Sequence, residues 1–362
     1  MAQPSVAVPE STPVTGRLLS LDAFRGLTIA LMILVNTAGG LPEAYSPLLH
    51  AEWDGLTLTD CVFPSFLWMV GLSLTLSRKR ALMPVLRRGL ILYLLGLFIY
   101  IFPHFDLPTA RLLGVLQRIA ICYVAASLIY MYTGVRVQIL WIVGLLVSYW
   151  VLMTMMAVPG FGAGRLDEAG NFSHYIDSIV LGNHNYAHTK TWDPEGIVST
   201  LPSIATALFG VLAAQLVRSK RVLSERTTWM YLIGACLTVA GLAVSMTMPI
   251  NKKLWSVSFA LVLAGLDYTA FASMLWIVDG NGYSGWVRPF AILGRNAIAV
   301  YMAAEIGETL LAMSGARDWL YSTAYASVLD PKNASLAFAL SYVLLMFGLA
   351  WVMHRRGWYV RV

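Results

Sequence analysis

Apolar runs of about 20 residues, separated by short polar stretches, recur along the whole chain of 362 residues. A helix needs about 20 apolar residues to cross a hydrocarbon layer about 30 Å thick, and only helices or closed barrels satisfy their backbone there. The pattern therefore predicts an all-α fold, a polytopic transmembrane helix bundle of about ten spans. The expected spans are 18–38, 59–77, 84–102, 112–132, 137–158, 196–217, 228–248, 254–277, 289–312 and 334–353.

Composition supports the membrane interpretation, because 58% of the residues are hydrophobic and only 12% are charged. A soluble domain carries about 25% charged residues. Residues 1–16 are polar and proline-rich, which predicts a disordered tail before a single transmembrane domain over 17–362. Cys61, Cys122 and Cys236 all fall inside apolar runs, so they provide neither a disulfide framework nor a metal-ligand spacing.

Basic residues are distributed unevenly between alternate loops. With the N-terminus inside, 15 of the 25 Lys and Arg residues fall on the cytoplasmic side and 7 on the opposite side. This excess is the positive-inside signature of membrane proteins. We therefore expect both termini in the cytoplasm and a multi-pass protein of the plasma (inner) membrane. The net charge of +6 then reflects basic cytoplasmic loops, so no nucleic-acid partner is expected, and membrane lipid is the expected surrounding.

Ionisable residues at membrane depth cost several kcal/mol unless they are paired or hydrated, so each is a functional candidate. Asp22 and Arg25 share one face of the first span near its cytoplasmic end, and Arg295 lies at a similar depth on the ninth span. Since a guanidinium matches phosphate geometry, Arg25 and Arg295 indicate a site for an anionic ligand that enters from inside. The alternative is an i,i+3 ion pair of Asp22 with Arg25 that only locks the helix.

A second polar group lies at the external ends of the early spans. Asn36 closes the first span, Asp60 opens the second, and His50 lies in the loop between them. Arg118 is near the external end of the fourth span, where it either contacts a substrate or neutralises Glu305 inside the bundle. A single His in an external loop is usually just solvated, so position alone does not make His50 catalytic.

The longest loop, residues 159–195, is too polar to cross a membrane. His184 and His188 have a spacing that binds zinc on a helix, but the neighbouring Asn and Gly favour a loop, so we predict no metal site. Asp193 and Glu195, in the stretch WDPEG, either bind the hydroxyls of a sugar or lie in the first turn of a capped helix. The residue types favour the helix start.

Seven sequence blocks carry a family resemblance. They are RLLSLDAFRG, LMILVNTAGG, HAEWDGLTLTDCVFPSFLWMVG, GVLQRIA, WDPEGIVSTLPSI, NKKLWSVSF and LGRNAIAVY. In these blocks, and in their order, the chain resembles the heparan-α-glucosaminide N-acetyltransferase family of membrane acyltransferases. The blocks spread over most of the chain and include rare residue types at membrane depth, so their combination is far more specific than any single motif.

The resemblance implies a membrane acyltransferase fold and the transfer of an acetyl group from cytoplasmic acetyl-CoA, a co-substrate, to a glycan acceptor on the far side. An amino sugar is the acceptor type that the family suggests, and a homodimer is consistent with it. The family's active-site histidine falls on His50, and its neighbouring asparagine falls on Asn36. A heparan substrate is not implied, because the loop 159–195 is modest and the chain begins almost directly at the first span.

These assignments predict a role for each polar group. The phosphates of acetyl-CoA are expected near Arg25 and Arg295, and the thioester beside Asn36 and His50. His50 takes a proton from the acceptor or accepts the acetyl group first, tasks that suit an imidazole with a pKa of about 6.5. Asn36 donates to the developing oxyanion, and Asp60 orients His50. Asp22 is expected to complete the donor site, and the acceptor contacts are expected to be Trp53, Asp193, Glu195 and Arg118.

Two other classes of protein fit the polar residues. A transporter of a small solute or an envelope glycan precursor would use Asp267, Glu305 and Arg118 as a substrate or proton path. A non-catalytic, flippase-like partner for envelope glycans is the other. Within the enzyme class, the same residues serve N- or O-acetyl transfer, and either an acetylated histidine or direct transfer in a ternary complex.

Overall fold

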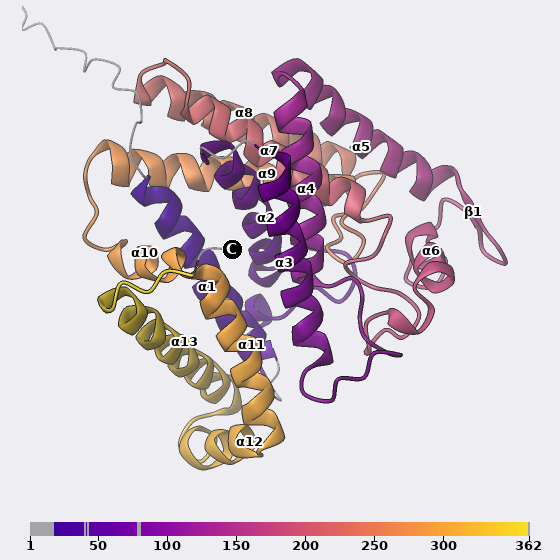
Figure 1. Ribbon diagram of the computed structural model, residues 1–362. Helices are drawn as coiled ribbons and strands as arrows, with labels where there is room; N and C mark the ends of the chain where they lie inside the picture. The colour runs from indigo at the N-terminus through magenta and orange to yellow at the C-terminus, as the bar shows by residue number, and fades with distance from the viewer. Residues whose placement is uncertain (1–17, 40, 42, 78–80, 361–362) are drawn as a thin grey trace, which may run out of the picture.

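The computed structural model describes residues 18–39, 41, 43–77 and 81–360 of the chain (Figure 1). The predicted disordered tail over 1–16 lies outside the described residues, as do the basic residues at 17, 78–80 and 361. The described part is helical apart from one short hairpin and its loops, which confirms the predicted all-α fold.

The elements follow the predicted spans closely. The longer α-helices are α1 (Leu19–Gly39), α2 (Leu58–Leu76), α3 (Leu82–Ile101), α4 (Val115–Tyr132), α5 (Val135–Met155), α7 (Thr200–Val217), α8 (Leu223–Val244), α9 (Val257–Met274), α11 (Ala297–Met313) and α13 (Pro331–Arg355). The shorter helices are η1 (Ser46–Leu48), α6 (Phe172–Val180), η2 (Gly182–His184), η3 (Leu275–Gly280), α10 (Arg288–Arg295), α12 (Ala316–Leu320) and η4 (Tyr321–Tyr325). Strands β1 (Ala157–Val158) and β2 (Gly162–Ala163) pair antiparallel, with Ala157 opposite Ala163.

Nine helices in the described residues are long and apolar enough to cross a membrane, with α9 continuing into η3. The ninth predicted span, 289–312, is instead the pair α10 and α11, bent by 80°. The break falls at Asn296, whose side chain is buried and binds the segment after α13. Its Nδ2 donates to the Trp358 carbonyl at 3.0 Å, and its Oδ1 accepts from the Val360 amide at 3.0 Å.

Four helices form the interior of the bundle, namely α1, α2, α7 and α9, while α3, α5, α8 and α13 present more of their surface to the outside. The close approach of α2 and α7 depends on glycine. A Cβ atom on Gly71 would lie 1.8 Å from the Ala207 carbonyl oxygen, and one on Gly210 would lie 1.9 Å from that of Trp68. The two backbones therefore touch, as small residues allow between helices in a membrane.

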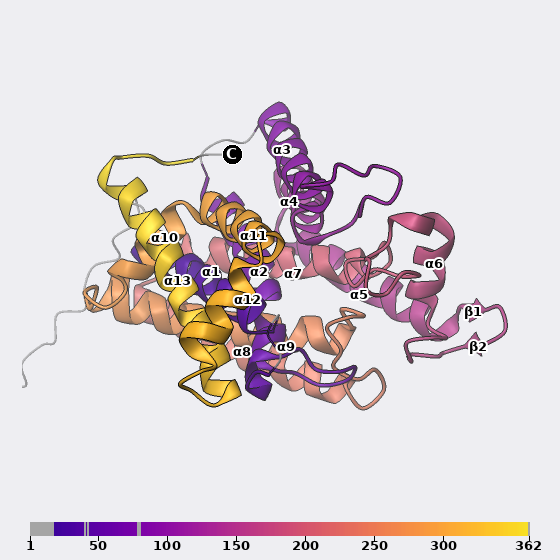
Figure 2. The same ribbon diagram turned by 90° about the horizontal axis from the view of Figure 1, so that it is seen from below.

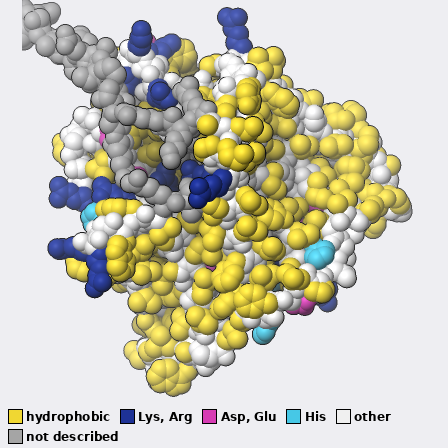
Figure 3. Space-filling model, viewed as in Figure 1, with side chains coloured by type: hydrophobic (Ala, Val, Ile, Leu, Met, Phe, Trp, Pro, Cys, Tyr) yellow, Lys and Arg dark blue, Asp and Glu magenta, His cyan; other side chains and the backbone are white. Residues whose placement is uncertain are grey.

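The surface of the molecule is that of a membrane-crossing bundle, and a small substructure lies beside the end of α5. Hydrophobic side chains cover most of the face in Figure 3, while most Lys and Arg side chains gather at its upper and left margins. Helix α6 and the β1–β2 hairpin lie next to the end of α5, on the side away from α10 and α13 (Figures 1 and 2). This small substructure belongs to the long polar loop, and it borders the site described next.

Candidate active site

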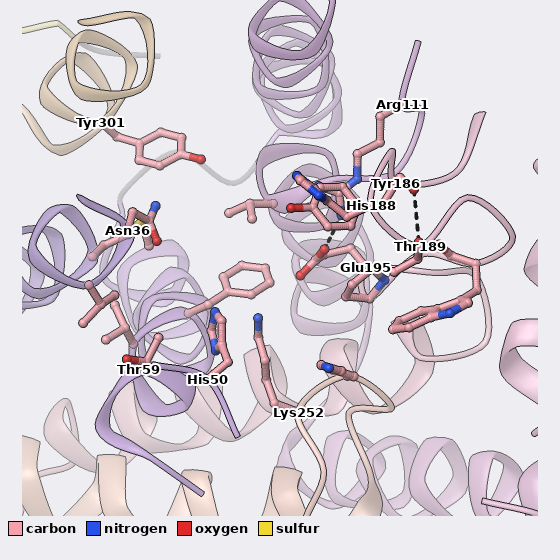
Figure 4. A pocket seen from close by; sticks show the side chains of 18 of the residues that line it. Asn36, His50, Thr59, Arg111, Tyr186, His188, Thr189, Glu195, Lys252 and Tyr301 are labelled. Carbon is pink, nitrogen blue, oxygen red and sulfur yellow. Dashed lines mark hydrogen bonds and ion pairs between the residues drawn. The ribbon is translucent and has the colours of Figure 1, made fainter. Parts of the chain in front are cut away.

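A cavity of about 360 Å³ opens at one end of the bundle, and we call it the His50 cavity (Figure 4). Segments far apart in sequence meet around it: the end of α1, the loop before α2, residues 186–195, residues 252–253 and α11. The polar or ionisable side chains that line it include Asn36, His50, Thr59, Arg111, Glu168, Tyr186, His188, Thr189, Glu195, Lys252, Lys253 and Tyr301. The cavity therefore joins two of the predicted catalytic residues with one predicted acceptor residue.

His50 contacts a carboxylate directly. Its Nδ1 lies 2.6 Å from Asp60 Oδ1, and the imidazole stays 46% exposed while Asp60 is 1% exposed. Because a carboxylate only accepts hydrogen bonds, the contact places the proton on Nδ1 and leaves Nε2 with its lone pair. The structure thus brings together the pair for which Asp60 was predicted to orient His50.

Asp60 is held by the start of α2. Its Oδ2 accepts hydrogen bonds from the Thr57 amide at 3.0 Å and the Ala51 amide at 3.1 Å, while Oδ1 faces His50. Thr57 and Asp60 form a capping box, a motif that satisfies free amides at a helix N-terminus. The same residues that start the helix therefore fix the carboxylate beside the imidazole.

Asn36 lines the cavity from the end of α1, and its amide has one partner on α11. Nδ2 donates to Glu305 Oε1 at 3.2 Å. A primary amide carries two N–H groups, so the second remains for a ligand. The structure thus pairs Glu305 with Asn36 and not with Arg118, and it makes Glu305 the residue that orients Asn36.

Asp193 and Glu195 are tied to a residue that the sequence analysis did not single out. Arg111 donates from Nε to Asp193 Oδ2 at 2.7 Å and from Nη2 to Asp193 Oδ1 at 2.6 Å, and Nη2 also bonds Glu195. The guanidinium lies 4.4 Å from the centre of the Tyr186 ring. Asp193 is fully engaged and buried, whereas Glu195 also lines the cavity. Only a contact map could reveal this cluster, because Arg111 lies more than 80 residues before its partners in sequence.

The helix-start interpretation of WDPEG is wrong, because α7 begins at Thr200 and has no acidic residue in its first turn. Tertiary contacts hold the segment as a turn instead. Asp177 of α6 accepts from the Ile197 amide at 2.9 Å and the Asp193 amide at 3.4 Å, and a Cβ on Gly196 would lie 1.9 Å from its carboxylate. Burial raises the pKa of Asp177 to about 7.

Arg118 supports the same turn from α4. Its side chain is fully buried, donates to the Gly196 carbonyl at 3.0 Å and bonds Ser199. The guanidinium also lies 5.1 Å from the Trp255 ring centre. Arg118 is not among the side chains that line the His50 cavity in the described residues, so these contacts support the wall from behind. Its contact with an acceptor stays a prediction.

Aromatic rings form one wall of the cavity. Trp192 lines it and stacks on His174 with 3.8 Å between ring centroids, while Trp53 packs edge-on against Trp192 at 6.1 Å. Burial lowers the pKa of His174 to about 4. Trp53 donates its indole N–H to the Leu166 carbonyl at 3.1 Å and lies behind Trp192. Direct contact of Trp53 with an acceptor therefore stays a prediction.

The other two histidines of the long loop, His184 and His188, face different ways. His184 donates from Nδ1 to the Ala110 carbonyl at 2.8 Å, whereas His188 lines the cavity beside the Tyr186 ring. Within the described residues no group of three or more His, Cys, Asp and Glu side chains has the arrangement of a metal site.

A second cavity of about 430 Å³, which we call the arginine cavity, is lined by two of the three predicted donor residues. Arg25 and Arg295 line it from α1 and α10, and Asp22 lies between them, 3.7 Å from Arg25 Nη1 and 4.0 Å from Arg295 Nε. Arg25 also donates to Ser73 Oγ at 2.6 Å. The predicted i,i+3 ion pair is present, and both guanidiniums still reach the cavity.

Arg88 adds a third guanidinium to the arginine cavity. It lies on α3, 4.9 Å from the centre of the Tyr123 ring. In the sequence, Arg88 is only one of the 15 basic residues on the cytoplasmic side, because a basic pair near the end of a span is typical of a loop boundary. Val360, held by Asn296, lines another part of the same cavity.

The two cavities approach each other at a narrow apolar passage of about 10 Å³, which we call the neck. Met32, Val115 and Tyr301 line both the neck and the His50 cavity. The residues shared by the neck and the arginine cavity are Phe66, Leu116, Ile119, Ala297 and Ile298. The cavities therefore form one discontinuous path through the bundle.

The fold and these cavities define a class, that of polytopic membrane proteins with a histidine–carboxylate site inside a helical bundle. The chain belongs to the heparan-alpha-glucosaminide N-acetyltransferase family, because the family model for the catalytic region matches residues 17–246. This confirms the resemblance read from the sequence blocks.

Relatives from two mammals are similar over most of this chain. The heparan-alpha-glucosaminide N-acetyltransferase of Mus musculus is 29% identical over 359 residues, which cover 81% of this chain and 54% of the relative. That of Homo sapiens is 29% identical over 358 residues, which cover 81% and 53%. The chain thus spans about half the length of the curated relatives it matches.

Proposed function

We propose that this chain is a membrane acyltransferase that moves an acetyl group from acetyl-CoA to a glycan acceptor, with an amino sugar as the leading type. Acetyl-CoA enters the arginine cavity from the cytoplasm, and the acceptor enters the His50 cavity from the external side. The family membership supports the reaction class, and the name of the mammalian relatives supports the acetyl group and the amino sugar.

The observation that carries the proposal is the arrangement of the two cavities about one neck. Three guanidiniums surround the arginine cavity, which suits the several phosphates of coenzyme A. The lining of the neck is apolar and favours an uncharged arm over a charged group, and the neck must widen for the arm to pass. Beyond it lies the His50–Asp60 pair, where the thioester and the acceptor would meet. A solute transporter needs no such pair.

The chemistry follows from the free Nε2 of His50. In direct transfer, the lone pair of the acceptor nitrogen or oxygen attacks the thioester carbon while Nε2 takes the proton from that atom. The carbon–sulfur bond then breaks, and its electrons stay on sulfur. Asp60 stabilises the resulting imidazolium through Nδ1. The second N–H of Asn36 donates to the carbonyl oxygen. In the two-step route, Nε2 itself attacks the thioester carbon, the carbon–sulfur bond breaks and coenzyme A leaves as the thiolate, and the acetylated imidazole then passes the acetyl group to the acceptor.

The test uses the purified full chain with labelled acetyl-CoA and a panel of amino sugars and hydroxylated glycans. Wild type should release free coenzyme A and form acetylated product in equal amounts. His50→Ala should lose this turnover by about 10²-fold or more, because both routes need Nε2.

His104→Ala is the matched control, since His104 is an exposed histidine outside the residues that line either cavity. It should turn over like wild type. Normal turnover by His50→Ala would show that the catalytic assignment is wrong. A wild-type protein that accumulated labelled solute in vesicles without releasing coenzyme A would favour the transporter.

A further inference from the structure

Lys252 is a cation of the His50 cavity for which the mechanism above has no task. It is half-buried, and Figure 4 shows its ammonium end directed into the cavity, as is the His50 ring. In the part of the chain that the structure describes, this ammonium has no ion pair or hydrogen bond. Arg111, by contrast, is engaged by two carboxylates, and Lys253 donates to the Glu52 carbonyl.

The segment that carries Lys252 is fastened to the loop that carries His50. Asn251 Nδ2 donates to Asp54 Oδ1 at 3.1 Å, and Lys253 Nζ donates to the Glu52 carbonyl at 2.6 Å. The Gly55 amide donates to the carbonyl of the residue before Asn251, at 2.8 Å. These contacts flank Lys252 on both sides, so its backbone keeps a fixed place relative to the catalytic loop.

The same segment is held in a costly conformation. Trp255 has a φ of 52°, is fully buried and donates its indole N–H to Thr206 Oγ1 at 3.1 Å. Asn251 Oδ1 accepts from the Leu254 amide at 2.9 Å and closes the turn. A non-glycine residue at positive φ is unfavourable and persists only where the surroundings dictate it, often at functional sites. The turn therefore fixes the direction from which Lys252 enters the cavity.

We propose that Lys252 stabilises the negative charge on the thioester carbonyl oxygen during acetyl transfer. This inference rests on the proposed function. As the acceptor nitrogen or oxygen bonds to the carbonyl carbon, the π electrons of the carbonyl move to its oxygen. The Lys252 ammonium and the free N–H of Asn36 face this charge. When the carbonyl re-forms, the carbon–sulfur bond breaks, coenzyme A leaves as the thiolate, and the acceptor proton is on His50.

A structural role explains Lys252 less well. The nearest role would be that of counter-ion to Glu195, but Arg111 already pairs with Glu195. Burial lowers the pKa of Lys252, although Glu195 and Asp60 oppose this effect. A partly desolvated cation without a partner is unfavourable in the resting site and becomes favourable when an anion forms beside it. This difference between ground state and transition state is what accelerates a reaction.

The experiment compares Lys252→Met, Lys252→Gln and Lys252→Arg with wild type and with His50→Ala, all as purified full chains. Lys332→Met serves as the matched control, because Lys332 is exposed and outside the residues that line both cavities. Steady-state constants are measured for acetyl-CoA with glucosamine and with glucosamine 6-phosphate. We expect Lys252→Met and Lys252→Gln to lower kcat about 10²-fold with both acceptors, with KM values changed less than about threefold. Lys252→Arg should recover about tenfold.

Other outcomes overturn the inference. A kcat of either neutral variant within threefold of wild type would remove Lys252 from the transition state. A rise in KM restricted to glucosamine 6-phosphate would make Lys252 a binding group for an acidic acceptor instead. If Lys252→Met loses its thermal transition, Lys252→Gln and Lys252→Arg decide the matter. If wild type showed no turnover, the proposed function would be overturned as well. If wild type were active, His50→Ala inactive and Lys252→Met normal, only the role of Lys252 would be overturned.

Discussion

At the scale of single residues, the site depends on one hydrogen bond that sets a tautomer. Asp60 Oδ1 lies 2.6 Å from His50 Nδ1, so Nε2 is free to act as a base. Asp60→Asn should lower kcat by about 10²- to 10⁴-fold, because an amide N–H in that place favours the tautomer with its proton on Nε2. Steady-state kinetics measure the loss, and ¹⁵N spectra of the imidazole report the tautomer.

Asp60 also belongs to the capping box of α2, so a control must separate the two tasks. Thr57→Ala removes the cap partner and leaves the contact with His50 in place. It should cost about 1 kcal/mol of stability but much less kcat than Asp60→Asn. Equal losses of kcat in both variants would show that helix stability, and not the tautomer, controls the rate.

The buried ring of His174, in the aromatic wall of the cavity, should make the stability of the protein sensitive to acid. Its folded-state pKa is about 4, below the ordinary value of 6.5, because the ring is buried against Trp192. Below pH 6.5 the unfolded chain therefore binds a proton that the folded chain refuses, and stability is lost as the pH falls towards 4. The stability difference between wild type and His174→Phe should shrink by about 3 kcal/mol over this window, as measured by denaturation at several pH values.

Asp177, on the same helix, gives stability the opposite dependence on pH. Burial raises its folded-state pKa to about 7, so its favourable contribution is complete below pH 3.8 and is lost as the pH rises through 7. The difference in free energy of unfolding between wild type and Asp177→Asn should therefore fall by about 4 kcal/mol as the pH rises. If the stability differences for His174→Phe and Asp177→Asn changed with pH in the same direction, both pKa assignments would be contradicted.

At the scale of elements, the contact of α2 with α7 connects the two halves of the His50 cavity. Helix α2 carries Asp60, and α7 follows the turn that contains Glu195. Gly210→Ala should destabilise the protein by about 1–3 kcal/mol, because its Cβ would meet the Trp68 carbonyl at 1.9 Å. The apparent melting temperature in detergent measures this effect.

The matched control for that helix pair is Gly144→Ala on α5. Gly144 is exposed, and a Cβ there would have open space around it. The substitution should leave stability unchanged or raise it by about 0.5–1 kcal/mol, because alanine favours helix over glycine. If both variants lowered the melting temperature equally, close backbone packing would not explain the Gly210 effect.

Local signals in the sequence were sufficient for the spans and for the contact between His50 and Asp60. Hydrophobic periodicity acts within about 20 residues, and His50 and Asp60 are only ten residues apart around a helix start. The WDPEG turn was misjudged because Arg111 and Asp177, which hold it, are distant in sequence. The bend at Asn296 was likewise hidden, since its partners lie more than 60 residues further on.

At the scale of the whole molecule, the proposed reaction requires the two cavities to open on opposite sides of the membrane. Single cysteines at exposed Asn183, in the long polar loop, and at exposed Ser224, at the start of α8, test this orientation after Cys61, Cys122 and Cys236 are replaced by serine. A membrane-impermeant maleimide added to intact cells should label Asn183→Cys at once. Ser224→Cys should react only after the membrane is permeabilised.

The reverse labelling pattern would place the arginine cavity outside, where cytoplasmic acetyl-CoA does not reach it. Labelling of both positions in intact cells would indicate leaky cells, which a cytoplasmic marker protein controls for. The positive-inside distribution predicts the first pattern, because 15 basic residues fall on the side that holds Ser224 and only 7 on the other.

The neck has an electrical consequence. Its free volume of about 10 Å³ is no more than a single water needs, and its lining is almost wholly apolar. Such a constriction interrupts a file of water, so the neck, as the described residues form it, offers protons and metal ions no continuous aqueous route between the cavities. The proposed transfer of an acetyl group across the bilayer would then leave the membrane potential intact. A cell can keep many copies of this protein in an energised membrane without discharging it.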